Sequence, residues 1–246
     1  MIKRQIPNFI TLGNLLCGVM ACYYAANQAY AVAAVGICLG IFLDFFDGMS
    51  ARLLGVASSL GKELDSLADV VTSGVAPGFI LWGLLREGCE SLGGWVFHYL
   101  PALAVLMPLF AAYRLAKFNL DTRQSHSFLG LPVPSNALIW VGIALYLDST
   151  WSSVTGGYAP LLYQPWFLIV LAVVSLITDV LMVSEMPMFS LKVNFKDLSW
   201  KTNSVQYLFL IGCVAFIVVT RQWYAITLII LWYIILSAIT QRKHAE

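Results

Sequence analysis

Eight long apolar runs constrain this chain more than any other feature. They lie at residues 8–27, 30–53, 64–86, 96–118, 133–149, 163–184, 204–220 and 222–240. Roughly 20 apolar residues are enough to cross the hydrocarbon core of a bilayer as a helix. The runs are continuous rather than alternating, and a spanning segment must satisfy its backbone hydrogen bonds internally, so helices are expected rather than strands. The composition agrees, because 60% of the 246 residues are hydrophobic and only 11% are charged. The sequence therefore predicts an all-α, polytopic membrane bundle of about eight helices.

The basic residues predict the orientation of this bundle. An even number of spans places both termini on one side of the membrane. Of the 14 Lys and Arg residues, only Arg86 and Arg221 fall on the opposite side. The other twelve are Lys3, Arg4, Arg52, Lys62, Arg114, Lys117, Arg123, Lys192, Lys196, Lys201, Arg242 and Lys243. Cytoplasmic loops carry the excess of Lys and Arg, so both termini are expected in the cytoplasm and the protein in the inner, cytoplasmic membrane. No repeat or linker divides the chain, and residues 1–246 are expected to form one membrane-embedded domain.

Four acids interrupt the apolar pattern where the second and third helices meet on the cytoplasmic side. They are Asp44, Asp47, Asp65 and Asp69, within the stretch FLDFFDGMSARLLGVASSLGKELDSLADVV at 42–71. A buried acid at the bilayer centre costs about 2.5–3.5 kcal/mol on insertion scales, so four of them need a reason. Each helix carries two acids one turn apart, and antiparallel neighbours would bring all four together. Hard divalent cations prefer carboxylate oxygen and would remove the mutual repulsion. Two such ions would suit in-line phosphoryl displacement.

The residues among these acids indicate a phosphate-bearing substrate. At 100° per residue, Gly48, Ala51 and Arg52 share an arc of about 140° with the first two acids. The small side chains would let a nucleotide approach the helix, and the guanidinium offers a fork to a phosphate. Ser58 and Gly61 in the connection add hydroxyl and amide donors. Structural acids, a divalent-cation transporter and a UbiA-type prenyltransferase are alternatives. A transporter would place acids near the midplane on several helices, and UbiA-type aspartate motifs usually lie far apart in sequence.

The acidic stretch has the form D-x2-D-G-x2-A-R-x8-G-x3-D-x3-D. This form resembles the signature of the CDP-alcohol phosphatidyltransferase family at every fixed position from Asp44 to Asp69. The resemblance implies a membrane enzyme that cleaves the pyrophosphate of a CDP-lipid or CDP-alcohol, releases CMP and transfers the phosphatidyl group to an alcohol. It implies two divalent cations, Mg²⁺ or Mn²⁺, on the four aspartates, with Asp69 also acting as general base. The segment PNFIT resembles the element before the first helix of these enzymes. The residues expected to contact the CDP moiety are Asn8, Thr11, Gly48, Ala51, Arg52, Ser58 and Gly61.

Two further segments indicate the alcohol. YRLAKFNLDTRQSHSFLGLPVPSNA at 113–137 and LMVSEMPMFSLK at 181–192 resemble signatures of the phosphatidylserine synthase branch, with Lys117 in place of the commoner Arg. The resemblance implies CDP-diacylglycerol as donor, L-serine as acceptor, membrane lipids as partners, a homodimer and no nucleic-acid partner. A serine acceptor needs a cation for its carboxylate and polar groups for its ammonium. The candidates are Arg114, Lys117, Asn119, Arg123, Ser184 and Lys192. Glycerol 3-phosphate or inositol phosphate is the alternative acceptor, and either would favour a richer basic pocket.

Overall fold

The chain is built almost entirely of helices, and the computed structural model describes residues 2–56, 58–92, 94, 98–120, 128–151, 160–189 and 200–245. The α-helices are α1 (Ile2–Ala26), α2 (Tyr30–Leu54), α3 (Ser59–Asp69), α4 (Ala76–Leu92), α6 (Leu106–Leu120), α7 (Val133–Trp151), α8 (Pro165–Val183), α9 (Trp200–Thr220) and α10 (Ala225–Ala245). A π-helical segment, Val70–Val75, joins α3 to α4, and 3-10 turns lie at Leu100–Val105 and Pro160–Tyr163. The strands β1 (Phe128–Leu129) and β2 (Pro187–Met188) form one short antiparallel pair.

The predicted membrane bundle is confirmed. Six segments are long and apolar enough to cross a membrane, namely Gln5–Ala26, Tyr30–Leu54, Ser59–Leu92, Leu100–Leu120, Pro165–Val183 and Asn203–Thr220. Two shorter apolar helices, Val133–Asp148 and Ala225–Thr240, match the fifth and eighth predicted runs. The third run differs most from its predicted bounds of 64–86, because α3, the π-helical segment and α4 form one rod over 59–92.

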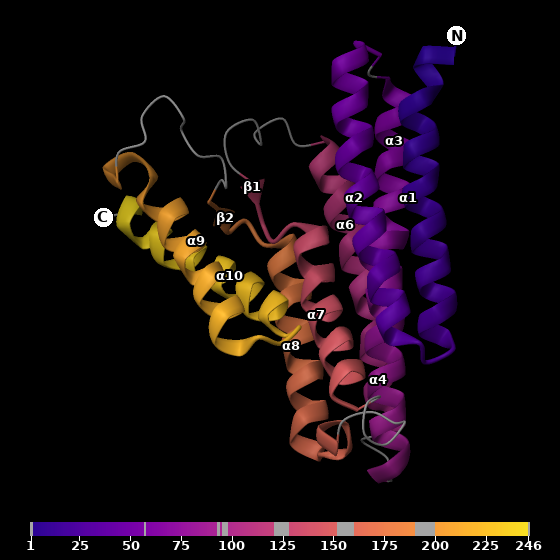
Figure 1. Ribbon diagram of the computed structural model, residues 1–246, viewed down its shortest axis with the longest axis vertical. Coiled ribbons are helices and arrows are strands. Elements are labelled where there is room, and N and C mark those ends of the chain that lie inside the picture. The colour runs from indigo at the N-terminus through magenta and orange to yellow at the C-terminus, as the bar shows by residue number, and fades with distance from the viewer. Residues whose placement is uncertain are drawn as a thin grey trace.

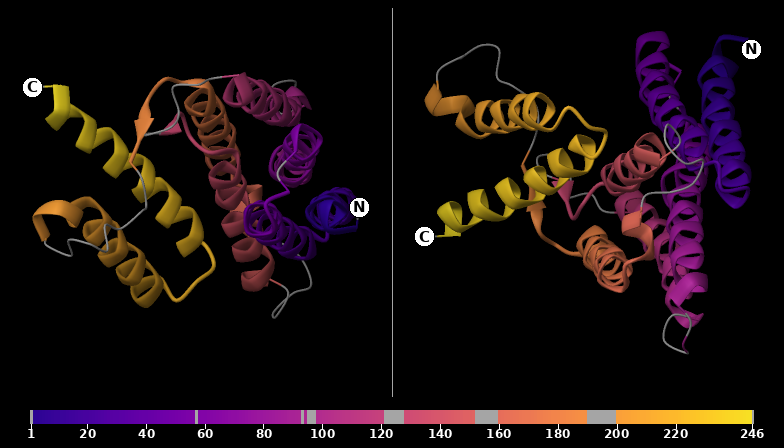
Figure 2. Two further views of the ribbon diagram at one scale, coloured as in Figure 1. Left: turned by 90° about the horizontal axis from the view of Figure 1, so that it is seen from above. Right: turned by 60° about the horizontal axis from the view of Figure 1, so that its bottom comes forward.

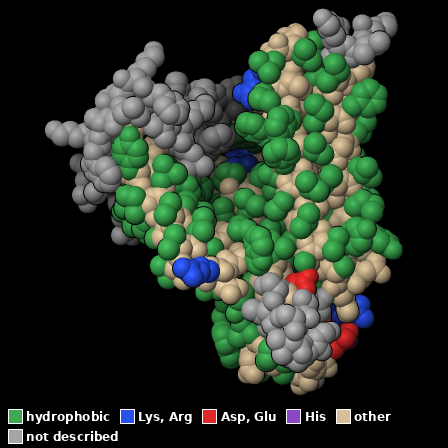
Figure 3. Space-filling view, in the orientation of Figure 1, with side chains coloured by type: hydrophobic (Ala, Val, Ile, Leu, Met, Phe, Trp, Pro, Cys, Tyr) green, Lys and Arg blue, Asp and Glu red, His purple; other side chains and the backbone are tan. Residues whose placement is uncertain are grey.

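The helices stand in two groups (Figures 1 and 2). The helices α1, α2, the α3–α4 rod, α6, α7 and α8 form the main bundle, while α9 and α10 form a hairpin that leans away from it and meets it mainly where α10 contacts α7. Fully buried Tyr30, Ile80, Leu84 and Trp140 belong to the core of the main bundle. Hydrophobic side chains cover most of the outer face in Figure 3, as expected of a surface that hydrocarbon rather than water solvates.

A tight turn sets the direction of the two helices that carry the acids. Gly55 ends α2 in the left-handed conformation (φ +62°), and its amide donates to the Arg52 carbonyl at 3.2 Å. A glycine adopts this conformation at little steric cost. Ser58 then caps α3, because its Oγ accepts a hydrogen bond from the Gly61 amide at 3.0 Å. The turn brings the start of α3 back beside the end of α2, as the short predicted connection requires.

Two glycines let α1 and α2 approach the π-helical segment. A β-carbon on Gly18 would lie 2.8 Å from the Thr72 Cα, and one on Gly40 would lie 2.8 Å from the Asn14 Oδ1. Thr72 uses the space to donate from Oγ1 to the Asn14 carbonyl at 3.1 Å. The close packing therefore fixes the part of the rod that directly follows Asp69.

We expect Gly18→Ala to lower the stability of the protein by about 1–3 kcal/mol, because the new methyl group would overpack rigid backbone. Gly13→Ala is the matched control on the same helix. A β-carbon there would meet only the flexible end of Leu43, at 3.3 Å, and alanine is the better helix former. Thermal unfolding of both variants in the same detergent tests this. Equal melting temperatures would contradict the packing argument.

Candidate active site

The four predicted acids converge on one side of the bundle. Carboxylate oxygens of Asp44 and Asp47 on α2 and Asp65 on α3 all lie within 4.8 Å of one another. Asp69, at the end of α3, is 8% exposed, and its carboxyl is close enough to that of Asp44 to interact with it. The antiparallel arrangement of α2 and α3 thus produces the cluster that the spacing predicts.

Neutral donors from α1 hold two of these acids. Thr11 Oγ1 lies 2.6 Å from Asp47 Oδ2, and Asn14 Nδ2 donates to Asp69 Oδ1 at 3.3 Å. Hydrogen bonds to an ionised carboxylate are shorter and stronger than neutral ones. Thr11 and Asn14 are themselves buried. Asn14 was not among the predicted site residues, although its polar side chain lies one helical turn after Thr11 in an apolar span and could have indicated the site.

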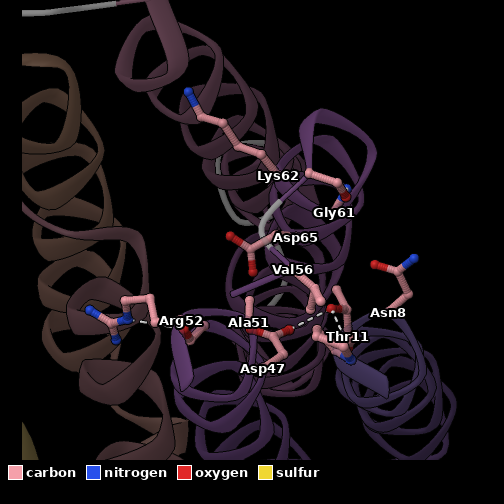
Figure 4. A pocket seen from close by; sticks show the side chains of 12 residues that line it. Asn8, Thr11, Asp47, Ala51, Arg52, Val56, Gly61, Lys62 and Asp65 are labelled. Atoms are coloured by element: carbon pink, nitrogen blue, oxygen red, sulfur yellow. Dashed lines mark hydrogen bonds between the residues drawn. The ribbon is translucent and has the colours of Figure 1, made fainter. Parts of the chain in front are cut away.

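A pocket of about 300 Å³ opens beside the acids (Figure 4). All seven residues expected to contact a CDP moiety line it, together with two of the acids and three further residues. The lining consists of Pro7, Asn8, Thr11, Asp47, Gly48, Ala51, Arg52, Val56, Ser58, Gly61, Lys62 and Asp65. A β-carbon on Gly48 would meet nothing within 4 Å, so the wall of the pocket is open at that glycine.

Two basic residues line this pocket, but both are directed away from the acids. The Arg52 Nε donates to the carbonyl of Gly48, one turn back on its own helix, at 3.0 Å. In Figure 4 its guanidinium and the Lys62 ammonium both point away from Asp47 and Asp65. The Lys62 Nζ donates to the Asn119 carbonyl on α6 at 3.0 Å. In this conformation neither cation neutralises the acid cluster.

A second, smaller pocket lies between α6, β1 and the end of α8. Its volume is about 10 Å³, and it is lined by Arg114, Lys117, Phe118, Leu129, Met182, Val183 and Ser184. Three of the six predicted acceptor residues therefore meet here. Asn119 instead bonds to α3, where its Nδ2 donates to Ser66 Oγ at 2.8 Å. Arg123 and Lys192 lie outside the described residues.

Arg114 is the unusual group of this small pocket. Its side chain is 7% exposed, its Nη2 donates to the Gly130 carbonyl at 3.3 Å, and its Nε has no hydrogen-bond partner among the described residues. Lys117, in contrast, lies 3.6 Å from Glu185 Oε1. A buried charge without a counterion is strongly unfavourable. The guanidinium therefore lacks an anionic partner among the described residues, and the pocket would have to widen to admit one, since its volume is about that of one water molecule.

The acid cluster fits hard divalent cations. Its donors are carboxylate oxygens, the ligands that Mg²⁺ and Mn²⁺ prefer. Four carboxylates this close together repel one another unless cations or protons intervene. Asp44, Asp47, Asp65 and Asp69 would hold such ions, with Thr11 and Asn14 orienting two of the ligands from behind.

A helical membrane bundle with an acid cluster beside a pocket of about 300 Å³ is the arrangement expected of a membrane enzyme that acts on phosphate esters. The family model of CDP-alcohol phosphatidyltransferases matches residues 4–180, and the chain belongs to this family. It is similar to the CDP-diacylglycerol–serine O-phosphatidyltransferase of Bacillus subtilis, with 38% identity over 135 residues, covering 53% of this chain and 70% of the relative. The Helicobacter pylori (strain 26695) enzyme of the same name is 32% identical over 196 residues, covering 79% of this chain and 74% of the relative. The Methanocaldococcus jannaschii enzyme of that name is 31% identical over 144 residues, covering 58% of this chain and 62% of the relative.

We expect Thr11→Val to weaken Mn²⁺ binding by about 10- to 100-fold, the usual effect of losing a group that orients a metal ligand. The valine keeps the shape of the side chain but cannot donate to Asp47. Thr11→Ser keeps the hydroxyl and should bind Mn²⁺ nearly as well as the wild type. Isothermal titration calorimetry of the purified proteins measures the affinity. Wild-type affinity in Thr11→Val would show that the hydrogen bond does not support a metal ligand.

Proposed function

We propose that this protein transfers the phosphatidyl group of CDP-diacylglycerol to the hydroxyl of L-serine, giving phosphatidylserine and CMP. The observation that carries the choice of acceptor is Arg114, a buried cation without a counterion among the described residues, beside the ion pair of Lys117 and Glu185. A zwitterionic amino acid matches this arrangement. Its carboxylate would meet the guanidinium, while its ammonium would find the Glu185 carboxylate and the Ser184 hydroxyl.

The proposed donor site is the pocket of about 300 Å³. The small residues Gly48, Ala51 and Gly61 leave room for the nucleotide, and Asn8 and Ser58 offer polar atoms to it. Divalent cations held by the four aspartates would neutralise the pyrophosphate and the charge that develops as CMP leaves. Arg52 would reach the phosphates only after its side chain turns, because its Nε is now bonded to the Gly48 carbonyl.

The reaction proceeds as a direct displacement in this proposal. Asp69 accepts the proton of the serine hydroxyl, and the serine oxygen forms a bond to the lipid-side phosphorus. The bond from that phosphorus to the bridging oxygen breaks, and CMP departs with the oxygen. Asn14 holds Oδ1 of Asp69, which leaves Oδ2 to face the substrate. The position of Asp69 at the end of α3, beside Asp44, supports the proposed role as general base.

The proposal also covers the orientation of the protein in the membrane, its oligomeric state and its domain boundaries. The acids, Arg52 and Lys62 lie near the turn between α2 and α3, and the basic residues predict that this end faces the cytoplasm of an inner membrane. Arg86 lies toward the other end of the α3–α4 rod, where it pairs with Glu90 at 2.7 Å. We further propose a single domain over residues 1–246 and a homodimer, which cross-linking in native membranes would test.

Other acceptors of the same family match the charges around this pocket less well. Glycerol 3-phosphate or inositol phosphate carries a dianionic group, which calls for several free cations. Among the described residues of the small pocket, Arg114 is the cation without an acidic partner, since Lys117 is paired with Glu185. Family membership also favours a phosphatidyl transfer over the transporter and prenyltransferase alternatives.

We expect purified protein to release CMP from CDP-diacylglycerol when Mg²⁺ or Mn²⁺ and L-serine are present. Glycerol 3-phosphate and inositol phosphate should give little release. Asp69→Asn should lower the rate by about 10²- to 10⁴-fold, because it removes the base and a carboxylate ligand. CMP is measured by chromatography and the lipid product by mass spectrometry. Release driven by a phosphorylated alcohol would overturn serine as the acceptor while keeping the family chemistry.

We expect Arg114→Lys to raise the KM for serine by roughly 30-fold or more, the scale of losing one partner of a buried charge pair. The lysine keeps the charge but loses the planar fork that binds a carboxylate with two hydrogen bonds. The KM for CDP-diacylglycerol should change little. Arg86→Lys, at an exposed ion pair, is the matched control. An unchanged KM for serine in Arg114→Lys would contradict the binding of the serine carboxylate in this pocket.

A further inference from the structure

Two hydrogen bonds join the helix of the acids to the helix of the small pocket. The Lys62 Nζ on α3 donates to the backbone oxygen of Asn119 on α6 at 3.0 Å. The Asn119 Nδ2 donates back to Ser66 Oγ on α3 at 2.8 Å. Lys62 and Ser66 are one turn apart on α3, so a single residue at the end of α6 is held by two successive turns of the other helix.

The end of α6 is a favourable place for such bonds. Asn119 lies in the last turn of α6, where the backbone carbonyls have no partner within the helix. A cation at the C-terminus of a helix satisfies these carbonyls and interacts well with the helix dipole. Lys62 does this although it lines the larger pocket, and Figure 4 shows its ammonium turned away from Asp65. The lysine thus tethers α6 in this conformation and does not neutralise the acids.

The two helices carry the two halves of the proposed reaction. On α3, Asp65 and Asp69 belong to the acid cluster, and on α6, Arg114 and Lys117 line the small pocket. Transfer requires the serine oxygen to come within about 3–3.5 Å of the phosphorus, in line with the leaving group. The separation of α3 and α6 therefore decides whether a serine held on α6 can reach a phosphorus held at α3.

We propose that Lys62, Ser66 and Asn119 form a strut that sets this separation, and that Ser66 and Asn119 are positioning residues for the attack by serine. The inference rests on the proposed function. It gives Asn119 a different task from the acceptor contact that the sequence predicts. A loosened strut leaves both substrates bound but places the serine hydroxyl out of line with the phosphorus.

A misplaced acceptor has a measurable consequence. Water then competes for the phosphorus: its oxygen forms the new bond, the bond to the bridging oxygen breaks, and a proton passes to the base. The products are phosphatidic acid and CMP. CMP release consequently exceeds phosphatidylserine formation, whereas a merely unstable protein would lose both products in proportion.

The test compares Ser66→Ala, Asn119→Ala and the double variant in full-length protein with CDP-diacylglycerol, Mn²⁺ and serine. We expect each single variant to lower phosphatidylserine formation by roughly tenfold, within the ~10²-fold that a misplacement of about 1 Å can cause. The double variant should lose little more, because the residues act on one contact. The ratio of CMP to phosphatidylserine should rise above that of the wild type. Asn27→Ala is the matched control, since Asn27 is exposed just beyond the far end of α1 and its Nδ2 donates to the Tyr23 carbonyl.

The outcomes separate this inference from the function it rests on. Wild-type protein that forms no phosphatidylserine overturns the proposed function and the strut with it. An active wild type with unchanged rates and product ratio in Ser66→Ala overturns the strut alone. Should Asn119→Ala unfold, Ser66→Ala decides by itself, because it removes one hydroxyl from a half-buried position. A tenfold loss with the wild-type product ratio also counts against the strut.

Discussion

The repulsion among four clustered carboxylates, two of them buried and two half-buried, is the constraint on which the rest of this structure depends. In a low-dielectric interior such charges interact far more strongly than in water, and acids within a membrane protein are costly even singly. The fold brings Asp44, Asp47, Asp65 and Asp69 together nevertheless, and the part of the chain that the structure describes supplies them with neutral donors from α1 and with no salt bridge. A lysine or arginine in their place would neutralise the cluster permanently. Hydroxyl and amide donors orient the acids and leave their charge for divalent cations.

The π-helical segment lets the α3–α4 rod contribute both to the acid cluster and to the hydrophobic core. One extra residue in a turn rotates every later side chain around the helix axis, and π-turns often occur at functional sites. Before this segment the rod presents acids to the site, and after it the rod presents Ile80 and Leu84 to the core. Thr72, within the segment, is held by the Asn14 carbonyl in the space that Gly18 and Gly40 leave. The same helix thus serves as wall of the site and as part of the hydrophobic core.

The sequence was most informative where local spacing decides the outcome. Apolar runs predict the eight apolar helical segments, six of which are long enough to cross a membrane, and the one-turn spacing of the acids predicts their convergence. The seven residues expected around the nucleotide all line one pocket. Local spacing accounts for those from Gly48 to Gly61, whereas Asn8 and Thr11 on α1 were expected from the family resemblance alone. Spacing within one helix says nothing of which residue on another helix a side chain meets. Asn119 was expected near the acceptor but bonds to Ser66, and Asn14 was not recognised as the partner of Asp69. Both depend on how helices more than fifty residues apart in sequence are placed, which no short motif encodes.

The placement of the helices also keeps Arg114 from forming an ion pair with the aspartates of the site. Ion pairs form when an acid and a base approach within about 4 Å, and no acid among the described residues comes that near to Arg114. If Arg114 could reach the aspartates, it would pair with one of them. That aspartate would then be less able to bind a cation, and the guanidinium would no longer be available to the carboxylate of an acceptor. The packing of α6 against α8 and the π-helical segment places the cationic pocket, and we propose that the hydrogen bonds between α3 and α6 set its separation from the acids. A reaction that joins a pyrophosphate donor to a zwitterionic acceptor needs that separation as much as it needs the approach of the two substrates.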